Sequence, residues 1–299
     1  MATPQTGIFA LGTASHAYLE MDLLPGADAS TTLSTVASLR EPRTTIGGVN
    51  VVVGFRPELW RSVEPDRAPP DVASFDQPVV GLGGYELPAT QHDIVIWLSG
   101  SGYDVVFDLS RTVVMALSPL AGLAHEMVGW PYHHDLDLTG FIDGTENPSL
   151  VEATGVVTIP DGRPGEGGSV LLLQQWEHDA AAWIALPTAQ QEQVIGRRKL
   201  DSEELDPKPD TSHVASTDQD RFGKIFRRNI GYGTLTQHGT IFVGFSRDRD
   251  RLDAMLESMA ATGGGPRDQL TVFTQAVTGA YYFVPASEAL AMFAGEPQG

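Results

Sequence analysis

The segment with the most distinctive chemistry is residues 139–148, which read Thr-Gly-Phe-Ile-Asp-Gly-Thr-Glu-Asn-Pro. Its acidic residue, Asp143, is preceded by an apolar Phe-Ile pair and stands between two glycines. Glycine lets the backbone approach a flat ligand closely, and a carboxylate fixed over an apolar face can act as a general base. The alternative is an ordinary Asp-Gly turn, and from the residues alone that turn is the simpler interpretation.

A second group of candidate ligands lies just before this segment, in His133-His134-Asp135 and Asp137. Imidazoles and carboxylates together suit several divalent metals. Neighbouring residues of an extended chain point to opposite sides, however, so four such side chains rarely converge. We therefore expect a polar loop that leads to Asp143, rather than a metal site.

The Asp143 segment resembles the Gly-x-x-Asp-Gly signature of the dye-decolourising peroxidases. The resemblance covers most of the chain, because further motifs follow in the family's order and at similar spacings: Ile195-Gly-Arg-Arg-Lys199, Ser212-His-Val214, Arg227-Arg-Asn229, Gly239-Thr-Ile-Phe-Val-Gly-Phe245 and Ala276-Val-Thr-Gly279. Within that family the chain is most similar to the short bacterial B-type without an export signal.

The resemblance implies a haem-dependent peroxidase that uses hydrogen peroxide to oxidise small-molecule reductants by one-electron steps. These reductants are dyes, phenolic compounds and, in some members, Mn(II). The cofactor would be haem b, held non-covalently with one per subunit. The resemblance also implies a homo-oligomer, often a hexamer. The alternative on the same fold is a haem-handling or iron-releasing protein, which would bind haem without peroxide-dependent turnover.

The resemblance assigns His213 as the proximal ligand of the haem iron, placed on a loop that leads to a strand. Such a histidine needs a hydrogen-bond acceptor on its other ring nitrogen, and the resemblance gives that role to Asp268. Without the resemblance, His213 would be a surface or capping histidine and Asp268 a loop carboxylate.

Asp143, Arg227 and Asn229 would face peroxide from the opposite side of the haem. Asp143 would move a proton between the two peroxide oxygens, Arg227 would stabilise negative charge on the leaving oxygen, and Asn229 would donate a hydrogen bond. The pair Arg227-Arg228 could equally be a solvated basic pair, and the resemblance alone selects Arg227.

Three further residues would complete the haem site. Arg197 is the candidate partner of the haem propionates, although an exposed arginine at a helix end is the alternative. Phe242 and Phe245 could line the pocket, although aromatic strand residues are more often plain core.

Charge and composition exclude several classes of protein. Lysine and arginine total 19 against 38 aspartates and glutamates, which gives the 299 residues a formal net charge of −19. Nucleic acid and anionic lipid are therefore poor partners, while cations are attracted. The simpler interpretation of the acidity is that it only maintains solubility. The absence of cysteine excludes thiolate-ligated haem and iron–sulfur clusters.

The N-terminal sequence has no basic region followed by an apolar stretch, and no apolar run approaches the roughly 18 residues of a membrane span. We therefore expect no membrane partner and a cytoplasmic protein.

A repeated pattern predicts the fold. Val51-Val-Val-Gly-Phe55 reads as a strand that enters a helix at Pro57, and Ile241-Phe-Val-Gly-Phe245 enters a second helix that contains Leu252 and Met255. One unit used twice predicts an α+β fold with duplicated ferredoxin-like domains of the dimeric α+β barrel type, antiparallel sheets with helices packed on them. The domains would be residues 1–150, which carry Asp143, and residues 151–299, which bind haem.

The remaining elements are expected around these two copies. Strands are predicted over residues 7–23, 94–98, 169–173 and 280–284. Helices are predicted from an N-cap at Ser30 to Leu39, from Tyr103 to Leu117, and from Thr188 onward.

Overall fold

The computed structural model describes residues 2–39 and 48–294. Residues 1 and 40–47 of the predicted first domain and residues 295–299 of the predicted second domain lie outside the described residues. Its strands are β1 (Ser15–Leu23), β2 (Val49–Phe55), β3 (Val79–Val80), β4 (Glu86–Leu87), β5 (Ile94–Gly100), β6 (Ala121–Trp130), β7 (Ser169–His178), β8 (Phe226–Arg227), β9 (Ile230–Gly233), β10 (His238–Ser246), β11 (Thr274–Ala276) and β12 (Ala280–Val284).

The α-helices are α1 (Ala29–Ala37), α2 (Pro57–Val63), α3 (Tyr103–Leu117), α4 (Leu150–Val157), α5 (Ala180–Ala185), α6 (Thr188–Ile195), α7 (His213–Ser216), α8 (Gln219–Phe222), α9 (Arg249–Ala260) and α10 (Ser287–Ala291). Short 3-10 helices are η1 (Thr6–Phe9), η2 (Pro65–Arg67), η3 (Leu82–Gly84) and η4 (Gln269–Val272). None of the helices described is long and apolar enough to cross a membrane.

The two halves of the chain repeat one strand arrangement. In the first half the sheet order is β2-β5-β1-β6, and in the second it is β9-β10-β7-β12. When the four strands of each half are numbered in chain order, the second pairs with the third, the third with the first, and the first with the fourth. This is the order expected of a ferredoxin-like β-α-β-β-α-β unit, and the predicted fold class is confirmed.

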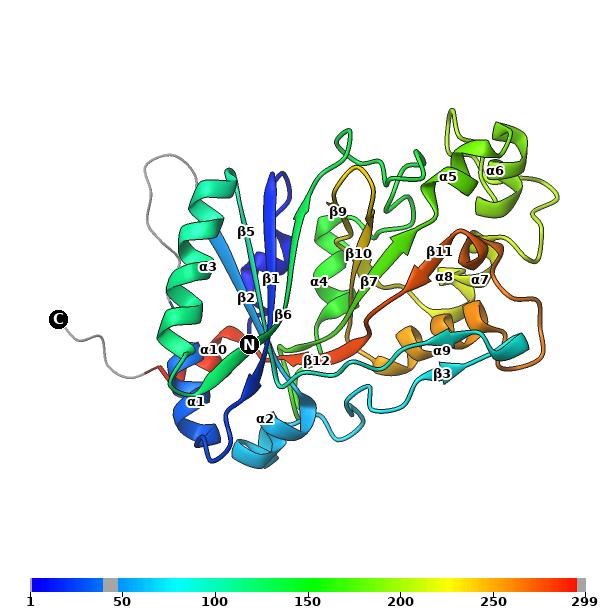
Figure 1. The fold of residues 1–299 in the computed structure, drawn as a ribbon. Coiled ribbons are helices and arrows are strands. Elements are labelled where there is room, and N and C mark those ends of the chain that lie inside the picture. Colours follow the sequence, from blue (N-terminus) through cyan, green and yellow to red (C-terminus); the bar gives the residue numbers. More distant parts are fainter. Residues whose placement is uncertain (1, 40–47, 295–299) are drawn as a thin grey trace.

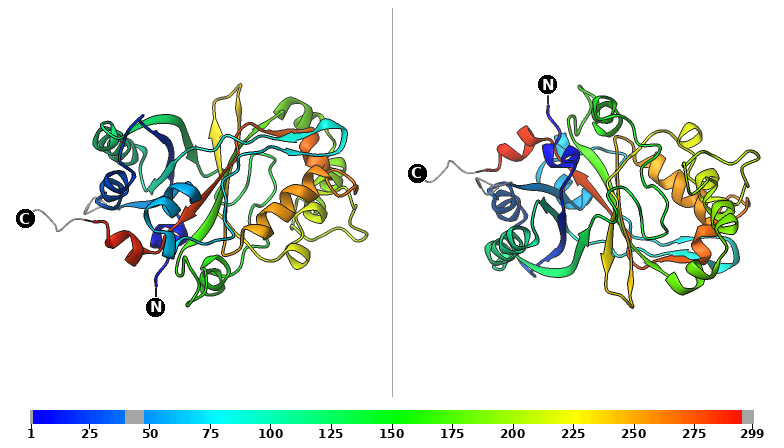
Figure 2. Two further views of the ribbon diagram at one scale, coloured as in Figure 1. Left: turned by 90° about the horizontal axis from the view of Figure 1, so that it is seen from below. Right: turned by 90° about the horizontal axis from the view of Figure 1, so that it is seen from above.

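The two sheets join into one closed ring of strands. β2 pairs with β12 and β6 with β9, while β10 pairs with both β9 and β7. The core inside the ring contains Tyr18, Trp97, Ile241 and Phe245. Helices α1 and α3 cover the outer face of the first half, and α9 covers the outer face of the second (Figures 1 and 2).

Two predicted boundaries are wrong near the N-terminus. The strand predicted over residues 7–23 begins only at Ser15, because Thr6–Phe9 forms a turn of 3-10 helix and Gly12 has a left-handed φ of 76°. The first helix is capped by Asp28 instead of Ser30, since the Oδ2 of Asp28 accepts a 2.7 Å hydrogen bond from the N–H of Thr31. The helix predicted over residues 103–117 and the strand over 280–284 have the predicted bounds.

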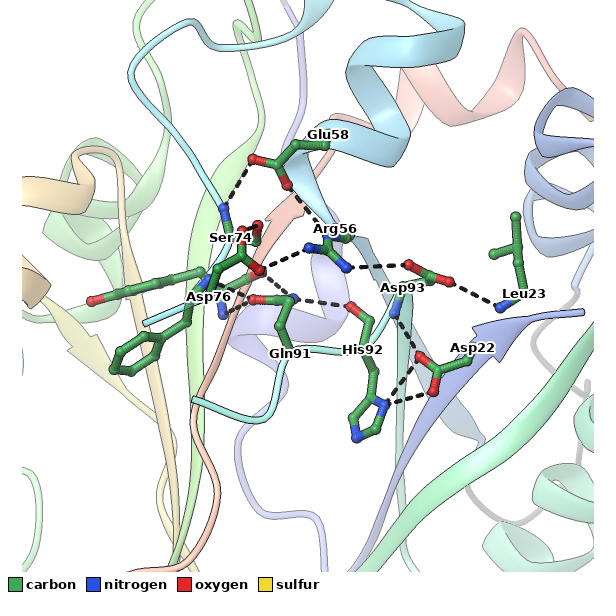
Figure 3. Close-up of polar contacts among 11 residues, drawn as sticks. Asp22, Leu23, Arg56, Glu58, Ser74, Asp76, Gln91, His92 and Asp93 are labelled. Atoms are coloured by element: carbon green, nitrogen blue, oxygen red, sulfur yellow. Dashed lines mark hydrogen bonds and ion pairs between the residues drawn. The ribbon is translucent and has the colours of Figure 1, made fainter. Parts of the chain in front are cut away.

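A glutamine side chain reinforces the seam where the halves meet. β12 and β2 pair at Phe283 and Phe55, and beside this contact Gln91 bonds to the backbone of β12 (Figure 3). Its Oε1 accepts from the N–H groups of Phe75 and Tyr281, at 2.8 and 2.9 Å, and its Nε2 donates to the carbonyl of Tyr281 at 2.8 Å. The amide therefore makes hydrogen bonds to backbone groups at the seam that a neighbouring strand would otherwise make.

We expect Gln91→Ala to lower the free energy of unfolding by about 2–4 kcal/mol, because it leaves part-buried backbone groups without partners. Urea denaturation of the variant tests this. Gln190→Ala, at an exposed position of α6, is the matched control. Equal stability of the two variants would show that the seam does not depend on Gln91.

Candidate functional site

A large pocket opens on the outer face of the second sheet, between its strands and the helices α7 and α9. The space between its walls, which includes open solvent at its mouth, is about 1190 Å³. Its walls are largely apolar, with these side chains among them: Leu172, Trp176 and Phe242 from strands, and Leu252, Met255 and Leu256 from α9. The pocket can therefore take a broad, flat, mostly apolar ligand.

The two-residue period of the strands decides which side chains reach this pocket. On β7, Leu172 and Gln174 line it, whereas Leu171 and Leu173 lie in the core of the ring. Phe242 lines the pocket, and its contact with haem stays a prediction. Phe245, three residues further along β10, points into the core and is fully buried, so for this residue the alternative of a plain core position holds.

His213 lies on the helix side of the pocket. It is the first residue of α7, whose N-cap Ser212 accepts a hydrogen bond from the N–H of Ala215. The predicted loop position is therefore wrong, because the residue begins a short helix. Its Nδ1 lies 2.7 Å from the Oδ2 of Asp268. Asp268 is fully buried, and its Oδ1 accepts from the N–H of Leu270 at 2.8 Å.

This contact fixes the state of the imidazole. Burial lowers the pKa of His213, but the charge of Asp268 and its hydrogen bond outweigh burial, and the net pKa is raised. Because an ionised carboxylate only accepts hydrogen bonds, Nδ1 carries the proton. In the neutral ring the lone pair then belongs to Nε2, the nitrogen that a metal would use.

Asp143, Arg227 and Asn229 line the same pocket as His213. The charge of Arg227 acts to lower the pKa of His213, so the two side chains are close enough to interact electrostatically. The Oδ1 of Asn229 accepts from the N–H of Val243 at 3.0 Å, which leaves its Nδ2 as the donor for other partners. The three residues predicted to act together are thus brought together.

Only one of the two adjacent arginines reaches the pocket. Arg228 points into the ring, where it donates to the carbonyl of Ile8 at 2.7 Å and lies 5.2 Å from the ring centre of Trp97. Arg227 lines the pocket, and its buried Nε has no hydrogen-bond partner among the described residues. An unsatisfied buried donor is costly, so this atom fits a site that receives an acceptor from a ligand.

Arg197 also lines the pocket, but its guanidinium is already engaged. Nη2 lies 2.8 Å from Glu146 and 2.7 Å from Glu204, and Nη1 donates to the carbonyl of Ser202. Its buried Nε has no partner within the described part of the chain. A role with haem propionates stays a prediction, and it would use this nitrogen or rearrange the ion pairs.

The histidine and aspartate cluster forms a loop, as expected. No group of three metal-binding side chains occurs in residues 2–39 and 48–294. His133 and His134 adopt φ values of 44° and 72°, which turn the chain, while Asp137 alone among the four lines the pocket.

Asp137 is a pocket residue that the sequence did not single out for this role. Burial raises its pKa to about 6, with the nearby charge of Asp143 also raising it, against hydrogen bonds from Thr139 that lower it. Gln174 was missed as well. It is 1% exposed, lines the pocket and has an Nε2 without a partner in the described residues. The signal in the sequence was strand alternation, because Gln174 lies two residues from Leu172 on the same strand and therefore faces the same side.

A comparison with protein families matches residues 134–289 to the Dyp-type peroxidase C-terminal family. Two curated relatives are dye-decolorizing peroxidases. That of Rhodococcus erythropolis is 34% identical over 83% of this chain and 75% of its own. That of Mycobacterium tuberculosis is 34% identical over 81% of this chain and 75% of its own.

Solved structures give the same result. A putative Dyp-type peroxidase from Shewanella oneidensis aligns with a TM-score of 0.88 and 28% identity, over 99% of this chain and 100% of that one. A variant of DypB from Rhodococcus jostii, solved in complex with heme, aligns with a TM-score of 0.82 and 31% identity, over 93% of this chain and 94% of that one.

The pKa of Asp137 leads to a test on the ligand-free protein. Because the folded-state pKa is raised from 3.8 to about 6, the contribution of Asp137 to stability is present below pH 3.8 and is lost as the pH rises through about 6. Relative to wild type, Asp137→Asn should therefore gain up to about 3 kcal/mol between pH 4 and pH 7.

Urea denaturation at both pH values measures this difference. Asp161→Asn, in an exposed loop, corrects for the removal of one negative charge. A difference between Asp137→Asn and wild type that does not change with pH would contradict the raised pKa.

Proposed function

This chain belongs to the Dyp-type peroxidase family, and we propose that its peroxidase chemistry is carried by His213 on one side of a haem and by Asp143, Arg227 and Asn229 on the other. The family membership makes the protein a haem-dependent, dye-decolourising peroxidase. The observation that carries the residue assignment is the contact between His213 and the fully buried Asp268, which leaves Nε2 for a metal in a pocket that also contains the other three side chains.

The residues of the pocket fit haem b. His213 would ligate the iron through Nε2, the apolar side chains Phe242 and Leu256 would lie against the porphyrin, and the unpartnered Nε of Arg197 would meet a propionate. When bound, haem supplies an iron centre that reduces hydrogen peroxide and returns to rest through two one-electron oxidations of reductants.

Asp268 would act through His213. Its fully buried carboxylate accepts a hydrogen bond from the Nδ1–H of His213, which would hold the ring in place and strengthen Nε2 as a donor to the metal. Asp268 is itself held by the N–H of Leu270, so the ring has a fixed support.

The three residues opposite would act on peroxide. Asp143 would accept the proton from one oxygen and deliver it to the other. The guanidinium of Arg227 would stabilise negative charge on the leaving oxygen. Asn229, with Oδ1 engaged by Val243, would donate from Nδ2 and orient the bound peroxide.

We infer that dyes and phenolic compounds are the reductants, because the relatives are dye-decolorizing peroxidases. Oxidation of Mn(II) is a further prediction. It is supported by the net charge of −19, which attracts cations, and by a variant of DypB solved in complex with manganese.

Three further properties are proposed on the family resemblance and the sequence. These are a homo-oligomer, with a hexamer as the expected form, a cytoplasmic location, and a division into domains near residue 150. The alternative of a haem-handling protein without turnover is not favoured, because the relatives are named as peroxidases.

We expect His213→Ala to lose haem, because the variant removes the only side chain assigned to the iron. The Soret absorbance per protein after reconstitution with hemin measures this. His238→Ala, in the β10 strand outside the pocket lining, is the matched control and should reconstitute fully. Full haem occupancy with unchanged axial ligation in His213→Ala would reject the assignment.

We expect Arg227→Ala to retain haem but to react with peroxide about 10²- to 10³-fold more slowly, the usual effect of losing one group that stabilises developing charge. Stopped-flow absorbance at the Soret band, with one equivalent of peroxide, gives the rate. Arg111→Ala, exposed on α3, should react like wild type. A normal rate in Arg227→Ala would mean that another group stabilises the leaving oxygen.

A further inference from the structure

The side chain of Asn147 is bonded to both backbone groups of Arg227. Its Oδ1 accepts from the N–H of Arg227 and its Nδ2 donates to the carbonyl of the same residue, each at 2.9 Å. The two residues are 80 positions apart in the chain. An amide that satisfies a donor and an acceptor of one residue fixes both its position and its orientation.

The location of Arg227 explains why such a contact is needed. Arg227 belongs to β8, the last strand of its sheet, and pairs with Gly244 of β10 on one side. Among the residues that the structure describes, no strand pairs with the other edge of β8, so the backbone groups there need another partner. The amide of Asn147 is that partner and takes the place of a strand.

Asn147 is also fixed relative to Asp143. Its N–H donates to the carbonyl of Gly144 at 2.9 Å, which closes a turn directly after Asp143. Gly144 has a φ of 74°, and a Cβ there would lie 2.9 Å from the Nδ2 of Asn147. Glycine is therefore required both by the turn and by the space that the amide occupies.

We propose that Asn147 is a positioning residue that sets the geometry between Asp143 and Arg227, by joining the loop of the first to the edge strand of the second. This inference rests on the proposed function, in which both side chains act on peroxide. Asn147 would not itself touch peroxide. It would act through the backbone of Arg227, whose guanidinium must meet the oxygen that Asp143 protonates.

Two variants of the holoenzyme test the proposal. Asn147→Ala removes both hydrogen bonds. Asn147→Asp keeps the shape and the acceptor for the N–H of Arg227, but places a carboxylate oxygen against the Arg227 carbonyl, so the test does not depend on one variant folding. Asn50→Ala is the matched control, because the Nδ2 of Asn50 bonds to the carbonyl of Ser99 in the first half, outside the pocket lining.

We expect both Asn147 variants to retain haem and to react with peroxide about 10- to 100-fold more slowly, the effect of a small misplacement of a catalytic group. Fluoride titration followed by absorbance is the readout that does not depend on turnover. Fluoride is a small anion that binds ferric haem and accepts hydrogen bonds from a nearby cation, so its dissociation constant should rise about tenfold. Asn50→Ala should match wild type in both measurements.

A double-mutant cycle shows whether Asn147 acts through Arg227. In an Arg227→Ala background, Asn147→Ala should change the peroxide rate and the fluoride dissociation constant by less than about twofold. Equal losses in both backgrounds, or no loss in the wild-type background, would overturn the positioning role while leaving the proposed function intact. A normal rate in Arg227→Ala alone would overturn the proposed function, and this inference with it.

Discussion

The site depends on the hydrogen bond between the Nδ1 of His213 and the Oδ2 of Asp268. A fully buried carboxylate is costly unless it is paired and hydrogen-bonded, and Asp268 meets this demand with the imidazole and with the N–H of Leu270. The same bond leaves the lone pair of the neutral imidazole on Nε2 and orients the ring. One interaction therefore accounts for a stabilised buried charge, a fixed tautomer and the nitrogen that we propose as the ligand of the iron.

The duplicated fold explains where the pocket lies. In the first half, the space between strands and helices is filled by side chains such as Leu33, Val106 and Val113. In the second half, the crossover from β7 to β9 is not one helix but a series of short ones, α5 to α8, with intervening loops. The equivalent space therefore stays open, and α7 brings His213 to its edge.

Much of this arrangement could be predicted from the sequence. The repeated strand patterns predicted the fold class, and the ordered motifs predicted the residues that meet in the pocket. What could not be predicted is set by distant partners. The contact between Asn147 and Arg227 joins residues 80 positions apart, and no local pattern carries such information. The sides to which Arg228 and Phe245 point, by contrast, follow from strand alternation once β8 and β10 are known.

In the proposed site His213 binds the haem iron, while Asp143 and Arg227 lie on the other side of the porphyrin. A crystal structure of the haem-loaded protein tests it most directly. We predict electron density that joins the iron to the Nε2 of His213, with the Nδ1 contact to Asp268 retained and both other side chains on the opposite porphyrin face. Iron bound by a different side chain, or a porphyrin with Asp143 and Arg227 turned away from it, would contradict the account.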